Sequence, residues 1–347
     1  MATPKLGYNP DFLKQPLPFP ELDLSDCVPL LDGKGHEIKY THFSLFQHRV
    51  RKLPLLAAVN ISGEAYSAAS RTGGDVWKYC EQIDEKYQID NSFYSKDLNT
   101  FDRGHIVRRV DPCWGDEQTS TQAEKDTFNW ANCSPQHTDL NQRSGIWYQL
   151  EQHIMEKGVK DKIADISVFA GPVLDKRDLN FIKPYKNNPI QIPSVFWKVI
   201  VWKKSNGKLY AVGFIMSQWE FIKDKMINGA KMEQAILKPK KKLEDDYFET
   251  LKFSDHKTYQ VSIKEIEKAT GISFSWSGVS FPFKKAKAQA ITAEPVKKVE
   301  SYASVFNVRL SPARNKESEI TQTQIKALEK AGEGYRLKRF ELKNITL

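Results

Sequence analysis

The stretch FDRGH, from Phe101 to His105, places a histidine directly after a glycine and two oppositely charged residues. Two polar segments follow it in the chain, NCSPQ at 132–136 and DLNQ at 139–142. Metal-assisted hydrolysis of a phosphodiester needs a base that takes a proton from water and an oxygen ligand for a divalent ion. An imidazole with a pKa near neutrality suits the first task, and an asparagine carbonyl suits Mg²⁺. The three segments therefore predict one site for this chemistry.

Each of these side chains also has a plainer interpretation. A single histidine such as His105 is more often a surface or core residue than a catalytic one. Asn141 could bind a metal or simply cap a helix, and Asp139 could be that cap instead. Arg71 could contact a phosphate oxygen or be one of many surface arginines. Glu151 could hold metal-bound water or lie on the solvated face of a helix. The residues by themselves leave these alternatives open.

The composition is that of a folded, basic protein. The chain has 347 residues, of which 40% are hydrophobic and 12% aromatic, enough to bury a core, so disorder throughout is excluded. The formal net charge is +9 and the isoelectric point is about 9.1. This balance fits nucleic acid or an anionic membrane surface as a partner, and it also fits a soluble basic protein without a polyanionic partner.

The cysteines and the N-terminus predict a reducing compartment. The four cysteines form no CxxC pair and no Cys/His zinc spacing, so we expect reduced thiols at Cys27, Cys80, Cys113 and Cys133. The first 20 residues contain no apolar segment of the kind found in secretory signals, and they are poor in arginine. No window approaches ~18 consecutive apolar residues, so we expect no transmembrane span and no membrane partner. A cytoplasmic location follows as the expectation.

Composition along the chain predicts three parts. We expect an irregular N-terminal arm over 1–40, a central domain over 41–283 and a basic C-terminal extension over 284–347. The extension carries 14 Lys and Arg against 7 Asp and Glu, so it holds most of the net charge. Within it we expect a linker over 284–300 and a polar helix over 318–331.

Hydrophobic runs predict the strands of the central domain. Buried strands are expected at 53–61, 166–174, 195–202 and 209–216, with a short strand within 101–110. The segment 111–131 has no clean period and is expected to be loop and short helix. Mixed strands and helices in this order indicate an α+β fold.

Two further helices are expected from periodicity and capping signals. Trp147, Leu150 and Ile154 form one apolar stripe, which predicts a helix from about 141 to 157. A second helix is expected at 262–270, where Ser262 and Glu265 have capping-box spacing and a glycine follows.

Six blocks of the chain, in order, resemble the DNA/RNA non-specific endonuclease family, which includes secreted bacterial nucleases and mitochondrial endonuclease G. Asp102–His105 matches the family's DRGH signature, and 132–136 is similar to its N-x-[ST]-P-Q segment. The other blocks are LNQ at 140–142 with WYQLE at 147–151, VFAGPV at 168–173, IPSVFWKV at 192–199 and QVSIKEIEKATG at 260–271. Together they span about residues 40–280.

The resemblance implies a ββα-metal fold, in which two short strands and a helix surround the site within a larger antiparallel sheet with flanking helices. The catalytic residues that it implies are His105 as general base, Arg103 and Arg71 as phosphate contacts, Asn132 as a positioning residue and Glu151 as a holder of metal-bound water. Asn141 would be the direct protein ligand of hydrated Mg²⁺, for which Mn²⁺ would be a substitute.

This chain departs from the family pattern in three places. Two extra residues, Arg143 and Ser144, lie between Asn141 and Glu151. If they lengthen the turn before the helix, Glu151 faces the metal, whereas inside the helix they rotate it by ~200°. Met155 stands where relatives often carry a charged residue, and the disulfides of the secreted members are not evident.

The activity implied is Mg²⁺-dependent hydrolysis of phosphodiester bonds in DNA and RNA, with little sequence specificity and 5′-phosphate products. An inhibitor or regulatory partner would bind through the C-terminal extension, and relatives suggest a homodimer. The alternative hypothesis is a catalytically weak, nuclease-fold nucleic-acid-binding module within a defence or effector complex.

Overall fold

The structure is a computed structural model. It describes residues 6–63, 65, 75–94, 101–138, 165–176, 178–181, 185–186, 188–219, 221–222, 258–284, 289–295 and 340–343. The helices expected at 141–157 and 318–331 lie outside these residues. No helix among the described residues is long and apolar enough to cross a membrane.

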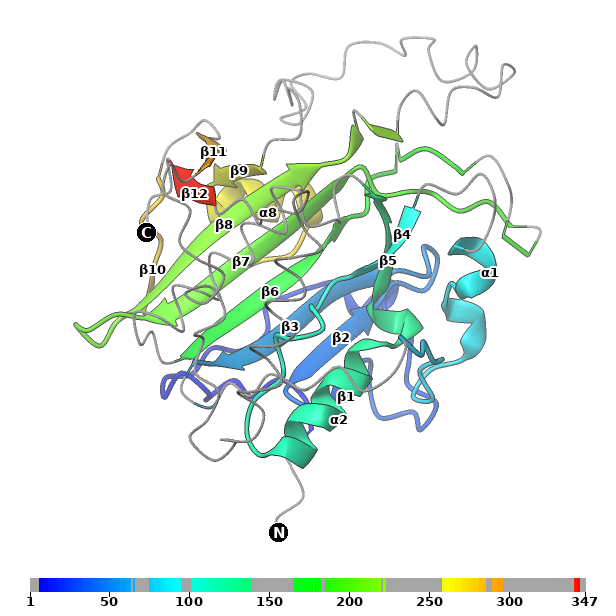
Figure 1. The fold of residues 1–347 in the computed structure, drawn as a ribbon, viewed down its shortest axis with the longest axis horizontal. Helices are drawn as coiled ribbons and strands as arrows, with labels where there is room; N and C mark the ends of the chain where they lie inside the picture. Colours follow the sequence, from blue (N-terminus) through cyan, green and yellow to red (C-terminus); the bar gives the residue numbers. More distant parts are fainter. Residues whose placement is uncertain are drawn as a thin grey trace, which may run out of the picture. The chain divides into compact units, whose positions relative to one another are not determined.

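The dominant element is an antiparallel sheet, as the α+β expectation requires (Figure 1). Its strands in spatial order are β1 (Ile38–Tyr40), β2 (Phe43–Gln47), β3 (Pro54–Ser62), β6 (Asp165–Val173), β7 (Val195–Lys203), β8 (Leu209–Ser217) and β9 (Thr258–Val261). The short strand β10 (Val279–Ser280) pairs with β8 in parallel. The four strands expected from apolar runs are confirmed, with ends that differ by one residue.

Three α-helices and three short 3-10 turns accompany the sheet among the described residues. They are α1 (Asn91–Tyr94), α2 (Glu117–Thr127), α8 (Ile263–Thr270), η1 (Leu24–Asp26), η2 (Glu85–Tyr87) and η3 (Trp130–Asn132). Helix α2 begins after Asp116, whose carboxylate accepts a hydrogen bond from Thr119 N at 2.7 Å. Helix α8 confirms the expected span and ends at Gly271, with φ of 71°, but the Ser262 side chain makes no capping hydrogen bond. The predicted capping box is therefore not formed.

The first hydrophobic core lies on one face of the large sheet. Alternate residues of β7 contribute Trp197, Val199 and Val201, all fully buried, and α8 contributes Ile263 and Ile266. Strands present every second side chain to the same face, which explains why apolar runs with period two build this layer.

The N-terminal arm is part of this core. Leu13 and Leu17 are buried in it, and the Tyr8 hydroxyl donates a 2.8 Å hydrogen bond to the Leu17 carbonyl. The indole of Trp276 donates to the Pro18 carbonyl at 2.9 Å, which fixes the arm to the end of the domain. Residues 38–40, which composition places in the arm, form β1 of the sheet.

The described residues divide into two compact units, with a boundary after Ile291. Strand β11 (Gln289–Pro295), expected as part of a linker, pairs with β9 through its first three residues. In the second unit, 292–295 of β11 pair antiparallel with β12 (Phe340–Lys343), with Thr292 opposite Lys343.

A separate two-stranded sheet consists of β4 (Phe101–His105) and β5 (Cys133–His137). It packs into a second hydrophobic core with α1 and with segments next to the large sheet. Buried members of this core are Leu53, Phe93, Phe101, Trp130, Cys133 and Ile192. All four cysteines of the chain are free and buried.

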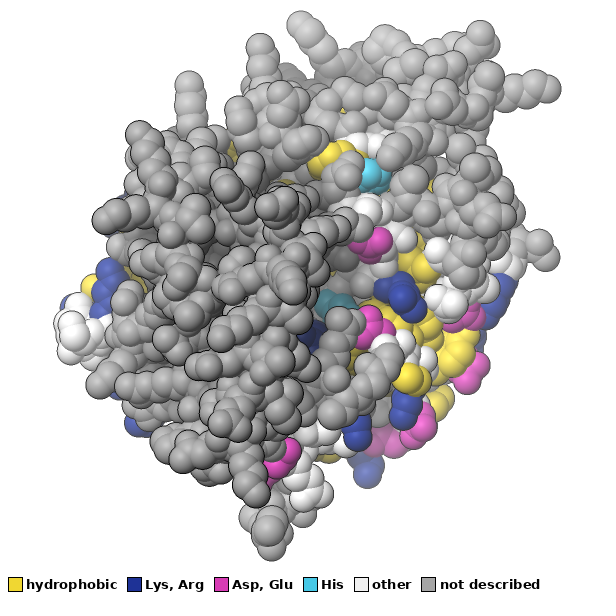
Figure 2. Space-filling model, in the orientation of Figure 1, with side chains coloured by type: hydrophobic (Ala, Val, Ile, Leu, Met, Phe, Trp, Pro, Cys, Tyr) yellow, Lys and Arg dark blue, Asp and Glu magenta, His cyan; other side chains and the backbone are white. Residues whose placement is uncertain are grey.

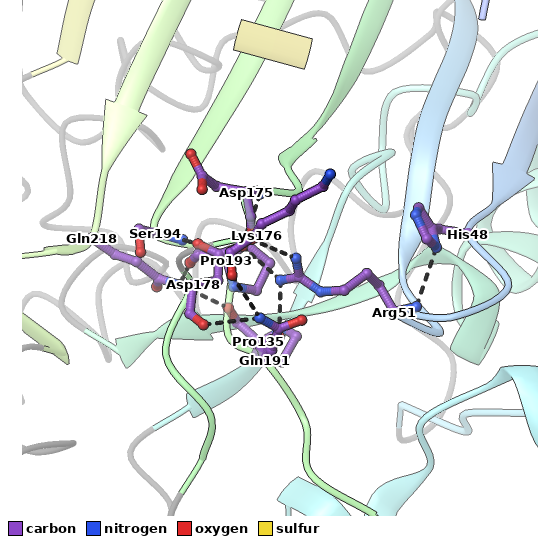
Figure 3. Close-up of polar contacts among 10 residues, drawn as sticks. All are labelled: His48, Arg51, Pro135, Asp175, Lys176, Asp178, Gln191, Pro193, Ser194 and Gln218. Carbon is purple, nitrogen blue, oxygen red and sulfur yellow. Dashed lines mark hydrogen bonds and ion pairs between the residues drawn. The ribbon is translucent and has the colours of Figure 1, made fainter. Parts of the chain in front are cut away.

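A buried ion pair joins the turn after β2 to the segment before β7 (Figure 3). Arg51 Nη2 lies 2.6 Å from Asp178 Oδ2, and Nη1 donates to the Asp175 carbonyl at 2.9 Å. Asp178 also accepts hydrogen bonds from Asp175 N at 3.1 Å and from Ser194 N at 3.0 Å. Burial nevertheless raises the pKa of Asp178, and Arg51 opposes that rise.

Removing the positive charge of Arg51 should destabilise the folded protein. We expect Arg51→Met to lower the free energy of unfolding by about 3–5 kcal/mol, because it leaves Asp178 buried without its charged partner. Urea denaturation followed by tryptophan fluorescence measures the change. Lys86→Met breaks an exposed ion pair with Asp84 and serves as the matched control, for which we expect no measurable change. Equal loss in both variants would contradict the assignment.

Candidate active site

The β4–β5 pair brings the DRGH and NCSPQ segments together. In its register Gly104 lies opposite Ser134, and His105 lies opposite Cys133. Because side chains alternate along a strand, Arg103 and His105 share one face of β4. Segments about thirty residues apart in the sequence therefore form one small surface.

Gly104 is required by the close approach of β5. A Cβ atom at this position would lie 2.5 Å from Gln136 Oε1 and closer still to Cγ and Cδ of the same side chain. The Gln136 side chain is itself buried. The glycine of DRGH thus permits the packing of the two strands.

His105 lies among aromatic rings. Its ring is half-buried, 4.6 Å from the Trp77 ring between centroids and 5.0 Å from Phe128, which it meets edge-on. Trp77 in turn stacks on Trp130 at 5.0 Å. The Nε2 atom of His105 is buried, and it makes no hydrogen bond within the described part of the chain. The rings therefore hold the imidazole in place.

The electrostatic surroundings keep His105 neutral. Burial, together with the guanidinium groups of Arg109, Arg103 and Arg108, lowers its pKa from 6.5 to about 3, against the opposing effect of Asp75. At pH 7 the imidazole therefore carries no charge. A neutral imidazole is the form that can accept a proton.

Asn132 forms hydrogen bonds with the chain directly after His105. Its Oδ1 accepts a hydrogen bond from Val107 N at 2.8 Å, and its Nδ2 donates to the carbonyls of Val107 at 2.9 Å and Thr127 at 3.0 Å. The Asn132 carbonyl accepts a further bond from Ile106 N at 3.0 Å. Asn132 is fully buried, so its contacts tie the end of β4 to the end of α2.

The arginines near His105 differ in their freedom to meet a ligand. Arg103 is exposed, and its guanidinium lies 5.9 Å above the Trp77 ring. Arg109 pairs with Glu124, and Arg108 lies 3.8 Å from Asp111. On the face drawn in Figure 2, basic, acidic and hydrophobic side chains mix on the side where Figure 1 places α1.

The structure brings together three of the six predicted site residues, namely His105, Arg103 and Asn132. Arg71, Asn141 and Glu151 lie outside the described residues. The described residues contain no group of three His, Cys, Asp or Glu side chains that could hold a metal ion. The sequence analysis did not include Trp77 or Phe128, and it assigned no role of its own to Gln136 of the NCSPQ segment, although a glycine inside a strand does signal a close approach by another group.

Comparison with known proteins places the chain in a family. A model of DNA/RNA non-specific endonucleases matches residues 28–280. The chain is also 32% identical over 280 residues to the uncharacterized protein y4fB of Sinorhizobium fredii, covering 78% of this chain and 39% of that protein. The chain belongs to the DNA/RNA non-specific endonuclease family. The membership confirms the resemblance carried by the DRGH and NCSPQ segments.

Other similarities agree with this family. A salivary endonuclease of Lutzomyia longipalpis is 27% identical over 193 residues, covering 50% of this chain and 44% of that protein. The alignments with this endonuclease and with y4fB thus span less than half of each relative's length. In fold, the chain is similar to a chain in the crystal structure of the EndoG/EndoGI complex, with 18% identity and a TM-score of 0.50 over 76% of this chain and 89% of that chain.

The fit of Gly104 against Gln136 can be tested by a double-mutant cycle. We expect Gly104→Ala to cost about 1–3 kcal/mol of stability, because the new methyl group overpacks the β4–β5 pair. Adding Gln136→Ala removes the obstructing atoms and should restore part of that loss. Urea denaturation of the four proteins measures the coupling. Strictly additive effects would show that the two residues do not meet.

The histidines predict how stability depends on pH. Burial lowers the pKa of His42 and His48 as well as that of His105, which falls from 6.5 to about 3. The unfolded chain therefore binds more protons below pH 6.5, so stability falls as the pH drops through this window. We expect the melting temperature of His105→Gln to fall less between pH 6.5 and 4.5 than that of the wild type. Parallel curves would contradict the depressed pKa.

Proposed function

We propose that this protein is a metal-dependent endonuclease that hydrolyses phosphodiester bonds in DNA and RNA with little sequence specificity. The observation that carries the proposal is the neutral His105, fixed by aromatic rings beside the exposed Arg103, in a chain of this nuclease family. His105 takes the proton of the attacking water. The products carry 5′-phosphate and 3′-hydroxyl ends.

The approach of substrate should make His105 a better base. A phosphodiester carries negative charge, and a negative charge close to an imidazole favours its protonated form. The pKa of His105 therefore rises towards the working pH when the substrate binds. Arg103 contacts a phosphate oxygen and neutralises charge that develops in the transition state, and Arg71 is the second residue assigned to this task.

A divalent ion, Mg²⁺ or in its place Mn²⁺, would be held directly by Asn141, and Glu151 would hold water bound to it. When bound, the ion would stabilise negative charge on the phosphate and on the leaving oxygen. Asn132 acts as a positioning residue, because its side-chain amide fixes Val107 and its main-chain carbonyl fixes Ile106, the two residues after His105. Asparagine and glutamate oxygens are ligands of the hard kind that Mg²⁺ prefers.

Binding to nucleic acid rests on the backbone phosphates. The net charge of +9 supports a polyanionic ligand, and contacts with phosphates release counterions, so affinity falls steeply as salt rises. An inhibitor protein is the partner that we assign to the C-terminal extension. The similar structure of the EndoG/EndoGI complex, which concerns EndoG inhibition, supports a partner of this kind.

Cleavage of plasmid DNA and of structured RNA tests the proposal. We expect cutting with Mg²⁺, none with EDTA, and a loss of about 10²–10⁴-fold in rate for His105→Ala, the usual contribution of a general base. His36→Ala is the matched control, since the His36 ring contacts the Val28 carbonyl on another part of the surface, and its rate should equal that of the wild type. Undiminished cutting by His105→Ala would remove His105 from the mechanism, and salt-sensitive binding without cutting would favour a binding module.

A further inference from the structure

Gln218 connects the β4–β5 pair to the large sheet. It follows β8 directly and its side chain is fully buried. Its Nε2 atom donates hydrogen bonds to the Pro135 carbonyl at 3.1 Å and to the Pro193 carbonyl at 2.5 Å (Figure 3). Its Oε1 atom accepts one from His137 N at 2.8 Å. All three groups that form hydrogen bonds with the Gln218 side chain belong to the main chain.

The side-chain amide of Gln218 takes the place of a neighbouring strand. In a strand, the carbonyl of one residue and the N–H two residues later point to the same side. Pro135 and His137 are such a pair on β5, whose other edge is paired with β4. The amide therefore satisfies the outer edge of β5 with the acceptor and donor that another strand would supply.

The other end of this connection is also rigid. Gln218 N donates to the Ser194 carbonyl at 2.9 Å, and Ser194 N donates to Asp178 Oδ1 at 3.0 Å. Asp178 is held in turn by Arg51. The Pro193–Ser194 segment thus hydrogen-bonds with both Gln218 and Asp178, which Figure 3 draws next to it.

Strand β5 links the Gln218 hydrogen bonds to the candidate catalytic residues on β4. Pro135 lies opposite Arg103, and Cys133 lies opposite His105 in the ladder that joins β5 to β4. A shift of β5 therefore moves the backbone that carries both side chains. A misplacement of about 1 Å by a distant mutation can cost ~10²-fold in rate, because catalysis depends on the alignment of reacting groups.

We propose that Gln218 is a positioning residue that sets the place of His105 and Arg103 by holding β5 against the large sheet. This inference rests on the proposed nuclease function for its effect on rate. Its structural part, the hold on β5 and β4, does not depend on that function. Without the amide, Pro135 and Pro193 keep buried carbonyls without this donor, and β5 loses its hydrogen bonds to the residue that follows β8.

The variant Gln218→Leu tests the proposal, with Asn60→Leu as its matched control. Asn60 is also a fully buried amide with three side-chain hydrogen bonds, from Asn9 N at 2.7 Å and to Asn9 O at 3.3 Å and Ser167 Oγ at 3.1 Å. It fixes the N-terminal arm and lies on β3, a strand of the large sheet that pairs with β2 and β6 and not with β4 or β5. We expect similar losses of melting temperature in the two variants.

Activity and hydrogen exchange separate the two variants. Per folded molecule, kcat should fall about 10–100-fold in Gln218→Leu with KM unchanged, and it should stay within a factor of two in Asn60→Leu. Amide exchange over 101–107 and 133–137 should accelerate in Gln218→Leu alone. Gln218→Asn, which keeps a shorter amide, should give intermediate values and remains usable if the leucine variant does not fold.

Two results would overturn the proposal: a fall in kcat no larger than that of Asn60→Leu, or unchanged exchange over 101–107 in the Gln218 variants. Failure of the nuclease function itself gives a different pattern. In that case the wild type cuts neither DNA nor RNA, while the exchange measurement still decides whether Gln218 holds β4 and β5.

Discussion

The candidate site depends on hydrogen bonds made to a pair of strands that could not keep their geometry alone. Two strands without further partners are marginally stable in water, and β4 and β5 form such a pair. Two buried amide side chains supply what the pair lacks. Asn132 fixes the chain where β4 ends, and Gln218 occupies the outer edge of β5. Since each amide offers both a donor and an acceptor, it can pair with main-chain groups as a strand does.

The surroundings of His105 balance two opposing requirements. Burial and nearby guanidinium groups keep the imidazole neutral, which leaves it able to accept a proton but also makes it a weak base in the free protein. In the proposed mechanism, the same cationic side chains attract a phosphodiester, whose negative charge then favours the protonated imidazole. Proton acceptance is thereby linked to substrate binding in this mechanism, because the charge of the bound phosphate adds to that of Asp75 in opposing the effects of burial and of the arginines. Arg103 contributes to both effects in this proposal, because its guanidinium lies over the Trp77 ring next to His105 and is also exposed at the surface.

Hydrophobic runs in the sequence correctly predicted the long strands of the large sheet. The apolar runs at β3, β6, β7 and β8 gave strands within one residue of those observed, because fully buried strands need continuous apolar sequence. The sequence analysis did not predict that the N-terminal arm is buried in the core or that 289–295 form the strand β11. Proline-rich composition reports a lack of regular structure, but it does not report burial, and Leu17 is buried through contacts with residues far along the chain. Similarly, the spacing of Ser262 and Glu265 permits a capping box without requiring one.

The same distinction separates the predicted and unforeseen residues of the site. Asp102–His105 and 132–136 are contiguous motifs, so their residues can be recognised and assigned to one site from the amino-acid sequence alone. Trp77 and Gln218 belong to no such motif. Gln218 meets β5 across 81 to 83 residues, and nothing in the sequence next to it indicates which backbone its amide will reach. Gly104 is the intermediate case, because a glycine within a strand predicts a close neighbour without identifying it, and only the structure shows that this neighbour is the side chain of Gln136, two residues along β5 from Ser134.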